Sequence, residues 1–287
     1  MVVTMALLAL LYVGLAAALY LLFGNASGFL IWGVLPIGLL WAQWYYSDTL
    51  ALKGMRAREV SPAEAPELHA LVDRLAALAD MKKPRVAISV SDVPNAFATG
   101  RSEDRAVVAV TTGLMKRLDE REMEAVLSHE LSHIAHKDVT VMTVASAVGV
   151  IAGFMIRSAM WSSMGRRDQN SAAMFFIFML IGVVVYAISF VLTRVLSRYR
   201  ELAADRAGAI LTGQPAALAS ALTKISGDMT RIPSRDLRAA EPYNAFFIYP
   251  AFTNKSFDIG SLFATHPPLD KRLDQLAKIS AELGRPM

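Results

Sequence analysis

Apolar and polar residues divide the chain into alternating stretches, and the first of these has no charge at all. No charged residue precedes Asp48, and the main interruption of the apolar run is the short stretch Gly24–Gly28. An uncharged run of about 20 residues is long enough to cross the hydrocarbon core of a bilayer. The pattern therefore predicts a transmembrane hairpin over residues 1–48, with spans at about 2–23 and 29–47.

A second apolar pair occupies residues 139–193. Its two segments, about 139–156 and 172–193, are separated by the polar stretch 162–170. The first segment is near the lower length limit for a span, and its small residues suit either a packed transmembrane helix or a buried hairpin. We expect four transmembrane helices in all.

Residues 49–138 have the mixed pattern of a water-exposed domain. Ser61–Glu64 predicts the start of a helix, with a proline at its first position. The apolar runs 86–90 and 106–110 predict short strands. His69, in the predicted helix, is expected to be solvated.

Residues 194–287 are expected to complete the same domain. The last apolar segment continues as a helix through Asp205, and Leu269–Ile279 has the spacing of a final helix. The stretch of roughly 228–265 between them has no clear period and predicts a long loop, of the kind that often forms a lid. The expected fold class is α+β, mainly helical.

The helix that begins near Asp119 carries the most specific signal. Asp119 and Glu122 have the spacing of a capping box. Further along this helix, His129 and His133 are four residues apart and share one face, with Glu130 between them. Two imidazole ligands and a carboxylate that can act as general base are what metal-assisted peptide hydrolysis requires. The motif predicts a zinc protease.

A catalytic zinc needs a third protein ligand. A metzincin would have a histidine where this chain has Val139 and a glycine where it has His136, so that class is excluded. Charged residues flank the motif closely, which argues against a site-two type protease inside the membrane. A glutamate from a second helix remains, and Glu201, with Asp205 four residues further on, is the best candidate. A surface carboxylate paired with a nearby arginine is the alternative for Glu201.

Composition and charge agree with a membrane protein. The 287 residues are 54% hydrophobic and 19% charged, with a mean hydropathy of +0.39 and a net charge of +4. The excess of positive charge lies beside the predicted spans, at Lys53, Arg56, Arg58, Arg194, Arg198 and Arg200. It does not form a basic stripe with interleaved aromatics, so we expect no nucleic-acid partner. By the positive-inside rule the polar segments face the cytoplasm, although Arg166 and Arg167 argue against this topology. The absence of cysteine excludes disulfides and thiol catalysis.

Four motifs together resemble one family. His129–His133, Arg200–Asp205, Thr265–Pro268 and Asn95–Phe97 are similar to the signatures of the HtpX family of integral membrane zinc metalloproteases, relatives of the type I CAAX prenyl proteases. The resemblance extends over nearly the whole chain. It implies a zincin-like protease domain with one Zn²⁺ per chain, interrupted by the second transmembrane pair at 139–193.

The resemblance also implies a role for each matched residue. Glu201 becomes the third zinc ligand beside His129 and His133, which makes the site gluzincin-like, and Glu130 the general base. Asp205 would hold a ligand imidazole from behind. His266 and Arg272 would act at the active site, and Asn95, Ala96, Phe97 and Ala98 would form the edge strand that binds substrate. A helix-start residue packed on the core is the alternative for His266, and a plain turn for residues 95–98. His136 is expected to lie outside the ligand set.

The resemblance implies an endopeptidase of the bacterial inner membrane that cleaves misfolded or damaged membrane proteins in stress-related quality control. Its partners would be polypeptide substrates and the lipid bilayer. A CAAX-type prenyl endopeptidase is the rival enzyme, but those relatives have more spans. A zinc transporter is the rival from another class. It would have ionisable residues inside its spans, whereas all five histidines lie outside them.

Overall fold

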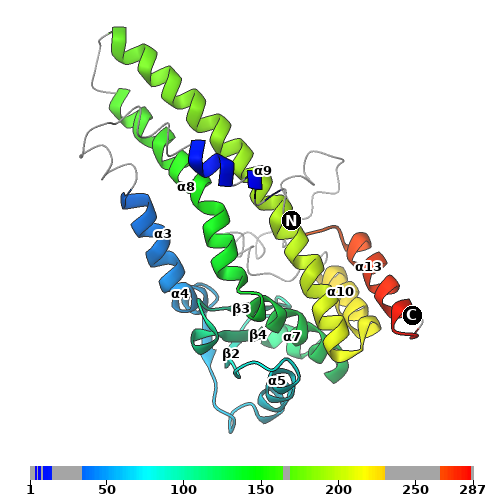
Figure 1. Cartoon of the computed structure of the whole chain (residues 1–287). Helices are drawn as coiled ribbons and strands as arrows, with labels where there is room; N and C mark the ends of the chain where they lie inside the picture. Colours follow the sequence, from blue (N-terminus) through cyan, green and yellow to red (C-terminus); the bar gives the residue numbers. More distant parts are fainter. Residues whose placement is uncertain are drawn as a thin grey trace. The chain divides into compact units, whose positions relative to one another are not determined.

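The computed structural model describes residues 4, 6–7, 9–14, 34–163, 169–229 and 266–285. It divides into two compact units (Figure 1). One comprises Met1–Tyr45 and Thr140–Leu196, and the other Tyr46–Val139 and Ser197–Met287. Of the predicted first span, only residues 4, 6–7 and 9–14 are described, and the predicted loop of 228–265 lies almost entirely outside the described residues.

The second unit is built on a four-stranded mixed sheet. Its strands are β1 (Ala57–Glu59), β2 (Arg85–Ser89), β3 (Ala96–Thr99) and β4 (Val107–Thr111), in the order β1-β2-β4-β3. β2 and β4 are parallel, and the other two pairs are antiparallel. Every residue of β4 is buried, as expected for a central strand covered on both faces. β3 therefore forms one edge of the sheet.

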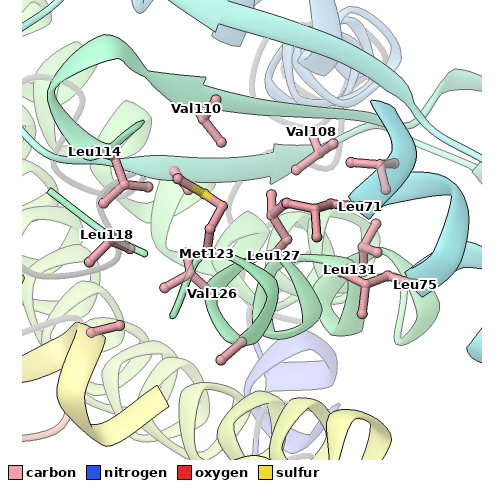
Figure 2. Packing of buried hydrophobic residues seen from close by; sticks show 14 of the residues in the cluster. Leu71, Leu75, Val108, Val110, Leu114, Leu118, Met123, Val126, Leu127 and Leu131 are labelled. Carbon is pink, nitrogen blue, oxygen red and sulfur yellow. The ribbon is translucent and has the colours of Figure 1, made fainter. Parts of the chain in front are cut away.

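Helices cover both faces of this sheet. On one face, α5 (Pro66–Leu78) and α7 (Glu120–Ala135) pack their apolar sides against β4. Figure 2 shows Leu71 and Leu75 of α5 meeting Leu127 and Leu131 of α7 in this layer. On the other face, α4 (Ser47–Gly54) contributes to a smaller cluster with β3 and β4. The core thus holds α7, the motif helix, firmly against the sheet.

The start of α5 differs from the expectation. The helix begins at Pro66, whereas the residues after Ser61 form a turn. The Glu64 carboxylate accepts hydrogen bonds from the Ser61 backbone N–H (2.7 Å) and hydroxyl (3.0 Å), which closes the turn instead of capping the helix. His69 is buried, with Nε2 3.0 Å from the Val60 carbonyl oxygen, so the expectation that it is solvated was wrong.

The N-terminus of α7 has the predicted capping box. The Asp119 side chain accepts from the Glu122 N–H (2.9 Å), and the Glu122 carboxylate accepts from the Asp119 N–H (3.1 Å). Glu122 also accepts from Ser220 and Lys224 of α10 (Pro215–Met229). Burial acts to raise the pKa of Glu122, but these hydrogen bonds outweigh it and hold the pKa below the ordinary 4.5.

The first unit contains α3 (Leu35–Tyr45), most of α8 (Asp138–Ser163) and the first part of α9 (Gln169–Thr212). α3 covers part of the predicted second span. α8 is longer than the predicted 139–156 segment, and α9 joins two predicted helices into one. Within the described residues, Asp138–Arg157 and Met179–Thr212 are long and apolar enough to cross a membrane.

Between α8 and α9 the packing is close at small residues. A Cβ on Gly149 would lie 2.9 Å from the Ser189 hydroxyl oxygen, and a Cβ on Gly182 would lie 2.8 Å from Cγ1 of Ile156. Small residues at such positions let apolar helices approach closely in a bilayer. The small residues of 139–156 therefore serve a packed helix pair.

Candidate metal centre

Two imidazoles of α7 face one another at the start of the site. His129 and His133 lie one turn apart, and their Nε2 atoms are 3.2 Å from each other. His129 is 1% exposed, so its ring is held by packing on all sides. The apolar residues of α7 pack against α5 and the sheet.

Helix α9 brings a carboxylate to the same point. Glu201 Oε2 lies 3.7 Å from His129 Nε2, and Glu201 Oε1 lies 3.6 Å from His133 Nε2. A tetrahedral metal with bonds of about 2.0–2.1 Å separates its ligands by roughly 3.3–3.4 Å. The three side chains therefore have both the donor types and the spacing of a tetrahedral metal site with one position left for water. Glu201 is buried, so the alternative of a surface carboxylate does not describe it.

Asp205 and Arg272 support His129 from behind. The Nδ1 atom of His129 is 2.9 Å from Asp205 Oδ1, and Arg272 donates to both Asp205 oxygens at 2.7 and 2.6 Å. Asp205 and Arg272 are almost fully buried. Burial alone would lower the pKa of Arg272, but Asp205 raises it above its ordinary value, so the pair stays ionised. A carboxylate on the second ring nitrogen directs Nε2 to a metal.

A second carboxylate supports His133, and the sequence motifs did not single it out. Asp138 Oδ2 lies 2.7 Å from His133 Nδ1. Asp138 is the first residue of α8, five residues after His133. The signal available in the sequence was a carboxylate just beyond the motif helix, which has no regular spacing to recognise.

His266 lies beside the third carboxylate. Its Nδ1 is 2.9 Å from Glu201 Oε2, and the residue is 6% exposed. Pro267 and Pro268 follow His266 and lead into α13 (Leu269–Glu282). The two prolines restrict the backbone conformation of the segment that carries His266. Arg272, one turn further, is 3.8 Å from Glu201 Oε2 but makes its short contacts with Asp205. Arg272 is therefore positioned to hold the carboxylates rather than a reacting group.

Glu130 connects α7 to the edge strand β3. Its carboxylate accepts a hydrogen bond from the backbone N–H of Ala98, and burial raises the pKa of Glu130. Asn95 accepts from Thr111 of β4, so by strand alternation Ala96 and Ala98 direct their backbone groups to the open side of the sheet. Residues 96–99 form a strand, not a plain turn, and that strand is an edge. The side chains of Asn95, Ala96 and Phe97 are buried, and Ala98 is half-buried.

Comparison with known proteins identifies the family. The model of "Peptidase family M48" matches residues 62–280. The chain belongs to this family. "Protease HtpX homolog 1" of Streptomyces coelicolor is 57% identical over 98% of this chain and 92% of that protein. "Protease HtpX homolog" of Moorella thermoacetica is 51% identical over 99% of this chain and 94% of that protein.

A solved structure shares the fold. The crystal structure of S. mikatae Ste24p aligns with a TM-score of 0.54 and 19% identity, over 96% of this chain and 67% of that chain. The M48 and HtpX matches, with two apolar helices that can cross a bilayer, make this M48 peptidase a membrane metalloprotease. The resemblance found in the four sequence motifs is confirmed.

Two further features of the M48 site follow from the packing of its helices. Gly208 of α9 touches α7, because a Cβ there would lie 2.9 Å from the His129 backbone nitrogen. His136, directly after α7, has its Nδ1 2.7 Å from the Ser132 carbonyl oxygen and is not one of the three candidate ligands. The close contact at Gly208 sets the distance between the two helices that supply the candidate ligands.

Proposed function

We propose that this M48 peptidase is a zinc-dependent endopeptidase of the gluzincin type, with one Zn²⁺ held by His129, His133 and Glu201. The triangle of donor atoms at 3.2, 3.6 and 3.7 Å is the observation that carries the proposal. Two neutral imidazoles and one carboxylate are the donor set of known zinc peptidases of this type. When bound, zinc polarises a peptide carbonyl and lowers the pKa of water.

Glu130 is the proposed general base. The Ala98 N–H would hold the carboxylate in place while it takes a proton from water and passes it to the leaving amine. A pKa raised by burial suits a group that must both accept and release a proton. Asp205, with Arg272 behind it, keeps the His129 ring in one tautomer during this cycle.

The substrate is proposed to add to the sheet as an extended strand along Asn95 to Ala98. The outward backbone groups of Ala96 and the Ala98 carbonyl offer pairing partners that do not depend on side chains. Such binding accepts many sequences, which suits a protease that removes damaged proteins. His266, beside Glu201, is proposed to donate to the developing oxyanion.

The proposed setting is the bacterial inner membrane, with several spans and the active site on the cytoplasmic side. Basic residues follow the predicted second span and the apolar part of α9, and the loop between the first two predicted spans has no charge. The proposed substrates are misfolded or damaged membrane proteins. Prenyl processing is the less favoured alternative, because the likeness to Ste24p at 19% identity extends to the fold alone. Cleavage of a protein substrate that stops when zinc is chelated would distinguish either peptidase activity from zinc transport.

The test uses purified full-length protein in detergent and a destabilised membrane protein as substrate. The wild type is expected to bind one zinc, to cleave, to stop cleaving after chelation and to recover with zinc. Glu130→Gln is expected to keep zinc and to lose activity by about 10²- to 10⁴-fold, because the base is removed but the ligands remain. His136→Ala is the matched control, directly after the same helix, and should retain both. Full turnover by Glu130→Gln, or full zinc retention by Glu201→Ala, would refute the assignment.

A further inference from the structure

At the end of α7, His133 contacts a pair of charged groups that the proposed reaction does not use, Asp138 and Arg200. His133 Nδ1 is 2.7 Å from Asp138 Oδ2, and the other Asp138 oxygen contacts the Arg200 guanidinium. Arg200 also donates to the His136 carbonyl oxygen at 3.1 Å. The side chains of His133, Asp138 and Arg200 are 16%, 12% and 12% exposed, so all three are largely withdrawn from water.

This arrangement repeats the one behind the other histidine. There, Arg272 holds Asp205, and Asp205 faces His129 Nδ1 at 2.9 Å. In both cases an arginine neutralises an aspartate, and the aspartate meets the ring nitrogen that points away from the site. A carboxylate at this position keeps the proton on Nδ1 and the lone pair on Nε2.

Asp138 and Arg200 also link the end of α7 to α9. α7 ends at Ala135, Lys137 has a left-handed backbone with φ of +54°, and Asp138 begins α8. Arg200 comes from α9, one residue before Glu201. Its contacts with Asp138 and with the His136 carbonyl therefore join the helix that supplies Glu201 to the end of the helix that supplies His133.

We propose that Asp138 and Arg200 are positioning residues for the metal site: Asp138 fixes the tautomer and orientation of His133, and Arg200 holds Asp138 in place. The inference rests on the proposed zinc ligation by His133. Arg200 acts through Asp138, so its removal should matter only while Asp138 is present. If Asp138 and Arg200 formed only a structural ion pair, zinc affinity would depend on the negative charge of residue 138 and not on an oxygen that faces the imidazole.

Zinc affinity of the purified full-length protein, measured by competition with a chromogenic chelator, tests the proposal. Asp138→Ala is expected to weaken zinc binding by about 10- to 100-fold, as for other residues that hold a metal-bound histidine. Asp138→Asn keeps an oxygen acceptor for Nδ1–H and should lie between the wild type and Asp138→Ala. Arg200→Ala should weaken binding as well, and the double variant Asp138→Ala/Arg200→Ala should bind no more weakly than Asp138→Ala.

Arg206→Ala is the control, because Arg206 is also on α9 but pairs with Glu282 at the surface. It should bind zinc as the wild type does. Wild-type affinity in Asp138→Ala, equal weakening in Asp138→Asn and Asp138→Ala, or effects of Asp138 and Arg200 that multiply would each overturn the inference. If Asp138→Ala does not fold, wild-type affinity in Arg200→Ala overturns it instead. Failure of the wild type to bind zinc would refute the proposed function, a different result from any of these.

Discussion

Replacing Gly208 by alanine tests whether close contact between α9 and α7 sets the metal site. The added Cβ would lie 2.9 Å from the Ser128 hydroxyl oxygen, 2.9 Å from the His129 backbone nitrogen and 3.1 Å from the His129 Cα. Two of these three atoms belong to the backbone and cannot rotate away. The helices must therefore separate beside His129, two turns from Glu201.

The size of the effect follows from a comparison with Gly227→Ala. Gly227 is also inside a helix, α10, but within the described part of the chain an added Cβ there meets nothing within 4 Å. Both variants gain the better helix propensity of alanine, about 0.5–1 kcal/mol. Only Gly208→Ala incurs an overpacking cost, about 1–3 kcal/mol. With about 2–4 °C per kcal/mol for a chain of this size, Gly208→Ala should melt roughly 2–12 °C below Gly227→Ala.

The assay is thermal unfolding in detergent at one heating rate, together with zinc affinity by chelator competition. Gly227→Ala should equal or exceed the wild type in melting temperature and bind zinc equally well. Gly208→Ala should melt lower and bind zinc more weakly, because metal–ligand distances tolerate only about 0.2 Å. Equal melting temperatures and equal zinc affinities in the two variants would show that the contact at Gly208 does not position the site.

Three further predictions follow from the fold and the site. Ala96→Pro should raise KM for all substrates, because proline blocks backbone pairing, whereas His266→Ala should lower kcat by about 10²- to 10³-fold with KM little changed. Steady-state kinetics on one peptide substrate tests both variants, and the reverse pattern would contradict the two roles. Because the pKa of Glu122 is lower in the folded protein, the ionised carboxylate stabilises the fold fully above about pH 4.5, and this stabilisation is lost as the pH falls through the folded-state pKa. The difference in melting temperature between the wild type and Glu122→Gln should therefore shrink on acidification, and a constant difference would contradict this. Single cysteines at positions 27 and 61, in place of Ser27 and Ser61, should react with an impermeant thiol reagent on intact cells at 27 only; labelling at 61 alone would invert the proposed topology.

The elements with a regular period were the ones that the sequence predicted well. α7 has the predicted capping box at Asp119 and the predicted pair of histidines on one face. The start of α5 was misplaced because two prolines four residues apart both suit a first helical turn. The hydrogen bonds between Ser61 and Glu64 decide the choice, and they compete with helix formation in a way that spacing does not reveal.

The features that could not be predicted from the sequence depend on contacts between segments that are distant along the chain. β1 has three residues, two of them exposed, and becomes a strand by pairing with β2. Glu201 was the best candidate for the third ligand, but only the motif match could assign it, because no pattern in residues 129–201 indicates that the chain returns to His129. Asp138 had no motif, and its role depends on the left-handed turn at Lys137, which the sequence pattern does not predict.

The hydrogen bond from Ala98 to Glu130 has a consequence for genetics. The donor is a main-chain N–H, so every amino acid except proline preserves it, and no side-chain truncation can remove it. An alanine scan is silent at positions 96 and 98, where alanine already stands. A part of the proposed active site is thus encoded in the path of the backbone. Selection on it would act through the residues that keep β3 paired with β4, and mutations that loosen that pairing should resemble mutations of Glu130 itself.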